Sequence, residues 1–218
     1  LGGTAVNPAW AAKETKAQAR CEEGSKSNNL AGVLYYQERY KEATPLARRA
    51  LAITEKACGR NHPMTAKALN NLGLILHAQN YSSEAEQLLR RALAIWKKIE
   101  SSDTPDNAAP LISLAMILSD QHRFAEAKPL LERASSVAGA LQMTGNYVEA
   151  ESLYRPALPL TEKIFGPDSL ETSAILTRLG VTLDYQRRYD EAEQLFSRSL
   201  QIKKRTLHPN DVRIADSL

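Results

Sequence analysis

The chain has 218 residues, of which 43% are hydrophobic and 24% are charged, a balance typical of a globular protein with a core. This composition excludes a disordered or collagen-like chain, and no apolar run reaches the ~20 residues of a membrane-spanning helix. The net charge of +3 comes with basic pairs spread along the chain, such as Arg48-Arg49 and Arg187-Arg188. A nucleic-acid binder gathers its basic residues into one patch with interleaved aromatic residues, so neither nucleic acid nor a membrane is an expected partner.

Cysteine and histidine are scarce in this sequence. There are two cysteines, Cys21 and Cys58, four scattered histidines and no CxxC motif. The sequence therefore predicts no metal site and no cofactor. Two free thiols are the favoured state of the cysteines, and a Cys21–Cys58 disulfide is a minor alternative. No signal peptide is evident at the N-terminus, which favours a cytoplasmic location and leaves a secreted or periplasmic one open.

The chain divides into residues 1–24, expected to be an N-terminal extension or capping helix, and residues 25–218, which repeat a common pattern. A short string ending in alanine recurs as "YKEA", "SSEA", "FAEA", "YVEA" and "YDEA". The separations between successive alanines are 42, 42, 23 and 42 residues. The five alanines are Ala43, Ala85, Ala127, Ala150 and Ala192.

Two further columns of small residues keep step with these alanines. One stands seven residues after each alanine and the other twelve residues before it, for example Ala50 and Ala31 in the first copy. Residues 189–200 and the preceding segment 170–186 both place apolar residues on one face of a 3.6-residue period. Each copy therefore predicts two antiparallel helices, A and then B, whose small residues let the helices approach closely.

Longer connections join each helix B to the next helix A, and two of them contain the pairs His62-Pro63 and His208-Pro209. Because proline ends one helix and polar residues cap the next, these histidines are interpreted as turn residues. The fourth helix B contains Pro156 and Pro159 in its interior. An interior proline costs roughly 3 kcal/mol, so this helix is expected to bend or break near Arg155.

The regular spacing fails between Ala127 and Ala150, which is 19 residues short of the period. The stretch around residues 124–146 joins the front of a helix B to the back of a helix A. Two explanations compete: a fused and shortened element, or residues missing from the sequence. The second is slightly favoured, because a real deletion would disturb the stacking of neighbouring repeats.

These motifs resemble tetratricopeptide repeats, and specifically those of the kinesin light chain type. The resemblance rests on "LNNLG" at residues 69–73, "EAEQLLRRALAI" at residues 84–95, "GRNHP" at residues 59–63 and the spacing of 42 residues. It covers about residues 25–218. HEAT and armadillo arrays have similar repeat lengths, but the ordered alanine columns argue against them. The resemblance implies an all-α, right-handed superhelix whose A helices line a concave groove that binds a peptide or a partner helix.

Groove positions follow from the register of the A helices. Asparagine can donate to and accept from a peptide backbone, tyrosine offers rigid contact area, and the cations suit an acidic ligand residue. The alternative is that the asparagines are ordinary polar surface. The predicted groove residues are Asn28, Asn29, Tyr35, Tyr36, Lys67, Asn70, Asn71, Leu74, His77, Met116, Gln142, Arg178, Val181 and Tyr185.

No catalytic motif is found: there is no phosphate-binding loop, no HExxH and no GxSxG. The sequence therefore favours a peptide-binding scaffold rather than an enzyme, with a protein or peptide as its partner. Two alternatives stay open. One is a self-assembly module that pairs through exposed ends of the array, and the other is a regulatory arm of a larger signalling protein or enzyme.

Overall fold

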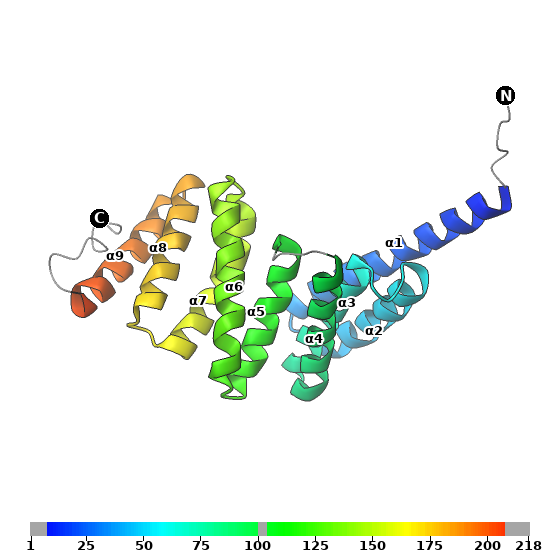
Figure 1. Ribbon diagram of the computed structural model, residues 1–218, viewed down its shortest axis with the longest axis horizontal. Helices are drawn as coiled ribbons and strands as arrows, with labels where there is room; N and C mark the ends of the chain where they lie inside the picture. The colour runs from blue at the N-terminus through cyan, green and yellow to red at the C-terminus, as the bar shows by residue number, and fades with distance from the viewer. Residues whose placement is uncertain (1–7, 100–103, 208–218) are drawn as a thin grey trace, which may run out of the picture. The chain divides into compact units, whose positions relative to one another are not determined.

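The computed structural model describes residues 8–99 and 104–207, and within these ranges every regular element is an α-helix. The chain divides into two compact units, residues 1–101 and 102–218. Figure 1 shows the helices of each unit following one another in chain order. Unit 1 contains α1 (Pro8–Tyr36), α2 (Tyr40–Ala57), α3 (Pro63–Ala78) and α4 (Ser82–Ile99). Unit 2 contains α5 (Pro105–Asp120), α6 (Phe124–Met143), α7 (Tyr147–Phe165), α8 (Leu170–Tyr185) and α9 (Tyr189–Thr206). The all-α fold of stacked helix hairpins is thus confirmed.

The small-residue columns lie where the helices cross. The five repeat alanines of helix B, Ala43, Ala85, Ala127, Ala150 and Ala192, are at most 2% exposed. The matching positions in helix A are also buried, as Ala31 and Gly73 illustrate. Because a small side chain lets two helix backbones approach, this burial confirms that the columns form the contact within each hairpin.

A left-handed residue closes each joint between helix A and helix B. The residue just before helix B donates its backbone N–H back into helix A, as Tyr81 does to the Leu76 carbonyl at 2.9 Å. The residue before it, here Asn80, has the positive φ. This pattern satisfies carbonyls at the end of a helix and needs a positive φ, which glycine adopts without strain. Only Gly145 meets that preference; the other four positions are Glu38, Asn80, His122 and Arg187.

The turn from helix B to the next helix A is built in the same way in both units. In unit 1 the His62 side chain caps α3 by accepting from the Met64 N–H at 3.1 Å. In unit 2 the Ser169 hydroxyl caps α8 by accepting from the Thr172 N–H at 3.1 Å. His62 is therefore a turn residue, as the sequence predicted, while His208 lies outside the described residues.

Within each unit, exposed ion pairs join one helix B to another. Arg48 of α2 pairs with Glu84 of α4 at 3.0 Å, and Arg155 of α7 pairs with Glu191 of α9 at the same distance. Both pairs join residues 36 apart in the sequence. They are exposed, so each contributes about 0–1 kcal/mol to stability. The pairs show that the B helices keep the same register in both units, although each pair adds little to stability.

The cysteines correct the sequence analysis, because Cys21 and Cys58 form a disulfide rather than two free thiols. Cys21 lies on α1, which extends far upstream of residue 25 as one helix. Cys58 stands at the C-terminal cap of α2. The bond therefore fastens the early part of α1 to the end of its partner helix.

The helix with two interior prolines is continuous. Of the two outcomes predicted near Arg155, a break does not occur, since α7 continues from Tyr147 to Phe165 through Pro156 and Pro159, while a bend stays a prediction. Both prolines are exposed, and so are Ser152 and Arg155, the residues whose carbonyls lose a partner. Water can satisfy those carbonyls, while the opposite face of the helix remains packed.

Most of the irregular stretch between Ala127 and Ala150 lies in one continuous helix, α6, which ends at Met143. Helix α6 buries Ala127 and Ala134 at positions typical of helix B, and Val137 and Ala138 at positions typical of helix A. One helix thus carries both sets of contacts and replaces the tail of one helix, a joint and the head of the next. Consistent with this, α5 packs against α7 as well as against α6.

The small columns can be tested by comparing two glycines that lie in helices. A methyl group at Gly73 would meet Leu89 Cγ at 3.0 Å and the Ala85 carbonyl oxygen at 3.4 Å, and Leu89 is fully buried. A methyl group at Gly32 would come no closer than 3.5 Å to Asn71 Nδ2. Chemical denaturation should show Gly73→Ala losing about 1–2 kcal/mol of unfolding free energy through overpacking. Gly32→Ala should gain up to about 1 kcal/mol through helix propensity, and equal effects would contradict the packing argument.

Candidate functional site

In unit 1 the predicted groove residues differ in how far they reach the surface. Asn28 and Asn70 are buried, 7% and 8% exposed, so their side chains are part of the helix packing rather than an open surface. Asn71 is half-buried and donates from Nδ2 to the Asn28 carbonyl at 3.4 Å, joining α3 to α1. Asn29, Tyr36 and Lys67 are exposed, and Tyr35, Leu74 and His77 are half-buried.

Several of these residues already have partners within unit 1. Tyr35 packs against Tyr36 and Tyr40, with ring centroids 5.5 and 5.7 Å away. Burial and the two neighbouring phenols raise the pKa of Tyr35, so it stays neutral in ordinary buffers. His77 Nδ1 lies 3.0 Å from the Ser82 hydroxyl at the start of α4. These contacts help to set the A–B joints.

In unit 2 the structure brings Gln142 and Arg178 together, since Gln142 Nε2 donates to the Arg178 carbonyl at 3.1 Å. Val181 is half-buried on the same helix as Arg178. Tyr185 is exposed and stacks on Tyr147, with ring centroids 4.6 Å apart and planes 4° from parallel. Met116 is half-buried on α5 and lies apart from this group.

Helices α6 and α8 keep the register that α1 and α3 have in unit 1. There Gly32 faces Asn71, eleven residues before Ala43 and fourteen before Ala85. In unit 2 Gly139 faces Arg178 at the same distances from Ala150 and Ala192. The bond from Gln142 to the Arg178 carbonyl is an addition that unit 2 makes to this shared contact.

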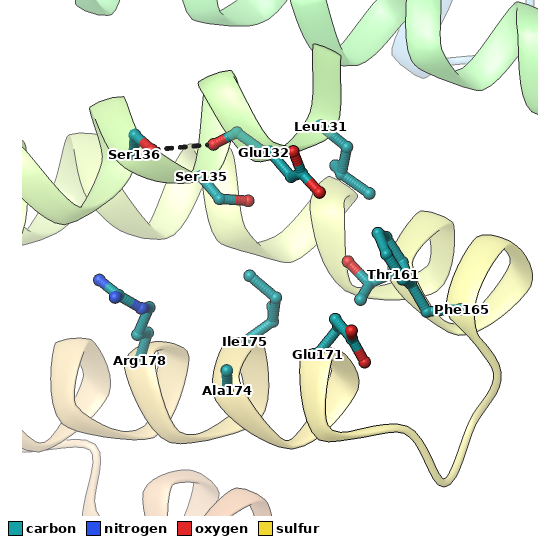
Figure 2. Close-up of a pocket in the computed structure, with 10 residues that line it drawn as sticks. All are labelled: Leu131, Glu132, Ser135, Ser136, Thr161, Phe165, Glu171, Ala174, Ile175 and Arg178. Atoms are coloured by element: carbon teal, nitrogen blue, oxygen red, sulfur yellow. Dashed lines mark hydrogen bonds between the residues drawn. The ribbon is translucent and has the colours of Figure 1, made fainter. Parts of the chain in front are cut away.

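A trough opens between α6 and α8. The two helices touch near Gly139 and Gln142 but make little contact elsewhere. The α6–α8 trough has a volume of ≈ 270 Å³, close to the lower end of the range for ligand pockets, about 300 Å³. It is lined by Leu131, Glu132, Ser135, Ser136, Thr161, Phe165, Glu171, Ala174, Ile175 and Arg178 (Figure 2).

The charged groups of the trough stand at different ends. Figure 2 shows Arg178 at one end and Phe165 at the other, with the carboxylates of Glu132 and Glu171 nearer to Phe165. All three charged residues are exposed. Within the described residues, Arg178 forms no ion pair with a carboxylate, and Glu132 and Glu171 form none with a cation. Between the two ends lie the Ile175 side chain and the Ser135 hydroxyl, while Leu131 lies nearer to Phe165 (Figure 2).

The Arg178 guanidinium packs over Gly139 and lies near the Tyr154 hydroxyl. A side chain on Gly139 would come within 2.8 Å of Arg178 Nη1 and 3.5 Å of the Tyr154 hydroxyl, so the guanidinium occupies the space that glycine leaves. Tyr154 is fully buried, and its hydroxyl has no hydrogen-bond partner of good geometry among the described residues. Burial raises the pKa of Tyr154, and the nearby guanidinium only partly opposes this effect.

A second hollow flanks α8 on its other side. It has a volume of ≈ 470 Å³ and shares Ala174 and Arg178 with the trough. Val181, a predicted groove residue, also lines it. Arg178 therefore lies between two hollows, and a ligand in either one can reach its guanidinium.

Sequence reasoning found Arg178 but missed most of the trough. Glu132, Phe165 and Glu171 were not among the predicted residues, because the prediction used only the central positions of the A helices. Phe165 ends α7, a helix B, and Glu171 lies in the first turn of α8. The signal that could have found them is the 23-residue step between Ala127 and Ala150.

Comparison with known proteins agrees with this architecture. The family model of the tetratricopeptide repeat matches residues 22–98, 82–138 and 134–205, which is most of the chain. The chain belongs to the tetratricopeptide repeat family. Proteins of this family are in general scaffolds that bind other proteins or peptides. No curated protein matches the chain in sequence.

Solved structures of tetratricopeptide repeat proteins are also similar to this chain. A kinesin light chain protein from Podosopora anserina with nearly identical TPR-like repeats is 22% identical, with a TM-score of 0.48, covering 85% of this chain and 98% of that one. BtubC from P. vanneervenii is 17% identical, with a TM-score of 0.45, covering 92% and 94%. YrrB, described as a TPR protein with an unusual peptide-binding site, is 19% identical, with a TM-score of 0.38, covering 87% and 88%. At these levels of similarity nothing about the partner of this chain follows from them.

None of the helices in the described part of the chain combines the length and the apolar character that a transmembrane segment requires.

Proposed function

We propose that this tetratricopeptide repeat protein binds an extended peptide segment of a partner protein in the α6–α8 trough. The observation that supports the proposal is the pairing of an apolar floor with charges of opposite sign at its two ends. Arg178 lacks a carboxylate partner in the described chain, and Glu132 and Glu171 lack a cationic one. Charged groups left this way at the ends of a concave, partly apolar site favour a ligand that brings the complementary charges.

The spacing on α8 suggests the charge pattern of the ligand. Glu171, Ala174, Ile175 and Arg178 follow one another on a single face of the helix. The seven-residue interval from Glu171 to Arg178 spans about 10.5 Å along a helix axis. An extended peptide covers that distance in about three residues, at ~3.3 Å per residue. The preferred ligand therefore carries a basic and an acidic side chain three residues apart, with an apolar side chain between them.

The remaining groove residues are proposed to act in the same way at the surface of unit 1. Asn29, Lys67 and Tyr36 are exposed there, and Lys67 Nζ lies 6.0 Å from the centre of the Trp96 ring. Asn28 and Asn70 are left out of this contact area because they are buried. The proposal for unit 1 is independent of the trough and rests on exposure and residue type alone.

The trough proposal is tested with an array of ten-residue peptides in which a lysine and an aspartate stand three positions apart around a leucine. Binding is measured by fluorescence anisotropy for the intact chain and for Arg178→Gln. Loss of a charged hydrogen bond costs about 1.5–3 kcal/mol, so the variant should bind its best peptide roughly 10- to 100-fold more weakly.

Arg205→Gln is the matched control, because Arg205 is exposed, lies outside the trough and stands 3.7 Å from Asp168. It should leave the affinity unchanged. A second arm replaces the aspartate of the peptide by lysine and tests it against Arg178→Glu, which should restore part of the lost affinity. Equal affinities for Arg178→Gln and Arg205→Gln would exclude the trough as the binding site.

A further inference from the structure

The first turn between a helix B and the next helix A brings together three side chains that can ligate metals. Cys21 and Cys58 are joined by the disulfide, and His62 lies beside them. The Sγ atoms and a ring nitrogen of His62 all lie within 4.8 Å of one another, and all three residues are half-buried. This group could not be inferred from the sequence, because Cys21 is 37 residues from Cys58 and lies on a different helix.

The turn itself keeps Cys58 and His62 at a fixed spacing. Gly59 has a φ of 110°, and its carbonyl accepts from the His62 N–H at 3.3 Å and from the Thr65 hydroxyl at 2.8 Å. Cys58 is tied in turn to the Thr54 carbonyl at 2.9 Å. The backbone therefore holds two of the three potential ligands in place without help from the disulfide.

Unit 2 contains the same corner without these residues. The positions of Cys21, Cys58 and His62 correspond to Lys128, Phe165 and Ser169, counted from the repeat alanines Ala43 and Ala150. There the Lys128 ammonium packs over the Phe165 ring at 4.9 Å, and Ser169 caps α8.

The turn of unit 2 is otherwise alike, since Gly166 has a φ of 105° and its carbonyl accepts from the Thr172 hydroxyl at 2.7 Å. The fold can thus build this corner from a cation–π contact and a serine cap. Two cysteines and a histidine are not required for it.

We propose that reduction of the disulfide converts this corner into a site for one thiophilic divalent ion such as Zn²⁺, held by Cys21, Cys58 and His62. Two thiolates and one imidazole are a ligand set that suits zinc, with water or a partner residue in the fourth position. The corner then links α1 to the α2–α3 turn in either state, by a disulfide or by a metal ion.

The change requires a reductant, which is a small thiol. Two thiol molecules each give one electron and one proton to the disulfide and leave as a disulfide of their own, and Cys21 and Cys58 become thiols. The metal ion then displaces the two thiol protons, which pass to solvent. With Zn–S bonds of ~2.3 Å in a tetrahedron, the two sulfur atoms come to lie about 3.7 Å apart, so the side chains separate by a small rotation.

Ligation by His62 changes the cap of α3. His62 Nδ1 now accepts from the Met64 N–H, so it carries no proton. If Nε2 binds the metal, the ring proton moves to Nδ1, which then can no longer accept a hydrogen bond. If Nδ1 binds the metal, the lone pair that accepts from the Met64 N–H is occupied by the metal. Either way the bond from Met64 is lost, and the Met64 amide reports whether His62 is a ligand.

The test uses the full chain, reduced with excess thiol, freed of the thiol under argon and titrated with Zn²⁺ alone. The decisive variant is His62→Ser, because serine caps the equivalent helix in unit 2 and both cysteines remain. Wild type should bind one Zn²⁺ per chain, and the Met64 amide signal should shift when it does. When Co²⁺ replaces Zn²⁺ at this site, thiolate-to-metal absorption should appear. His62→Ser should bind zinc at least tenfold more weakly, and the oxidised chain should not bind at this corner.

Cys21→Ser with Cys58→Ser should lose the absorption band, with circular dichroism to verify that the helices are retained. If that double variant unfolds, the comparison of wild type with His62→Ser still decides the question. Equal zinc affinity of wild type and His62→Ser would overturn the proposal, as would equal binding by the oxidised and reduced chains.

Discussion

Replacement of Trp96 by alanine should lower the free energy of unfolding of unit 1 by about 3–5 kcal/mol, the cost of removing a large buried aromatic side chain. Trp96 on α4 is only 1% exposed. It belongs to a cluster with Leu69 and Ala66 of α3 and with Ile95 and Ala92 of its own helix. An alanine there would leave a cavity that fixed helix backbones cannot close.

The effect is measured by chemical denaturation followed by circular dichroism, with hydrogen exchange to assign it to a unit. Amides of α3 and α4 should lose protection, while those of α8 and α9 should not, because helix-repeat stability is a sum of local terms and nearest-neighbour contacts. Val148→Ala serves as the control, since Val148 is 72% exposed. Uniform loss of protection in both units would contradict this local picture.

Trp96→Phe refines the same prediction. The Trp96 Nε1–H is buried and has no hydrogen-bond partner in the described part of the chain. Phenylalanine removes this unsatisfied donor while keeping most of the apolar volume. Its cost should therefore fall well below that of alanine. A cost equal to that of alanine would show that the fit of the indole, and not the volume, stabilises the cluster.

The repeat architecture could be predicted because it follows from local spacing. Ala43, Ala85 and their counterparts mark where two helices cross, and the crossing distance depends on the residue at that point rather than on distant parts of the chain. The same logic identified His62 as a turn residue. Periodicity thus determines the hairpins and their joints.

The disulfide could not be predicted, because it depends on how far α1 extends. The repeat pattern begins near residue 25, yet α1 begins at Pro8, and only this upstream extension places Cys21 opposite Cys58. Gly24, one turn further on, packs against Ile53 and Thr54 of α2, which brings the two helices close at this end. A helix without a clear pattern in its first half gives no register from which to infer that contact.

The trough could not be predicted for a related reason. Helices α6 and α8 touch near Gly139 and make little contact at the end that carries Leu131 and Glu171. Gly24 in unit 1 corresponds to Leu131 in unit 2, so the close approach of the first hairpin is replaced by a bulky side chain. A one-dimensional pattern shows that a helix is missing, but which surfaces become uncovered depends on the packing that follows.

Replacing Cys21 and Cys58 by serine should lower the free energy of unfolding of unit 1 by about 4 kcal/mol under oxidising conditions. The bond closes a loop between residues 37 apart, and a cross-link of this span restricts the unfolded chain by roughly that amount. The measurement is urea denaturation of the oxidised wild type and of the double variant. In excess thiol and without metal the two proteins should have nearly the same stability, which provides the control.

The loss should also be local, because the disulfide joins the early part of α1 to the end of α2. In the double variant the amides of α1 before Gly24 should exchange faster than those around Ala31, which is fully buried against α2. A destabilisation that persists in excess thiol would instead point to the serine side chains themselves. A double variant as stable as the oxidised wild type would mean that α1 is held by its packing alone.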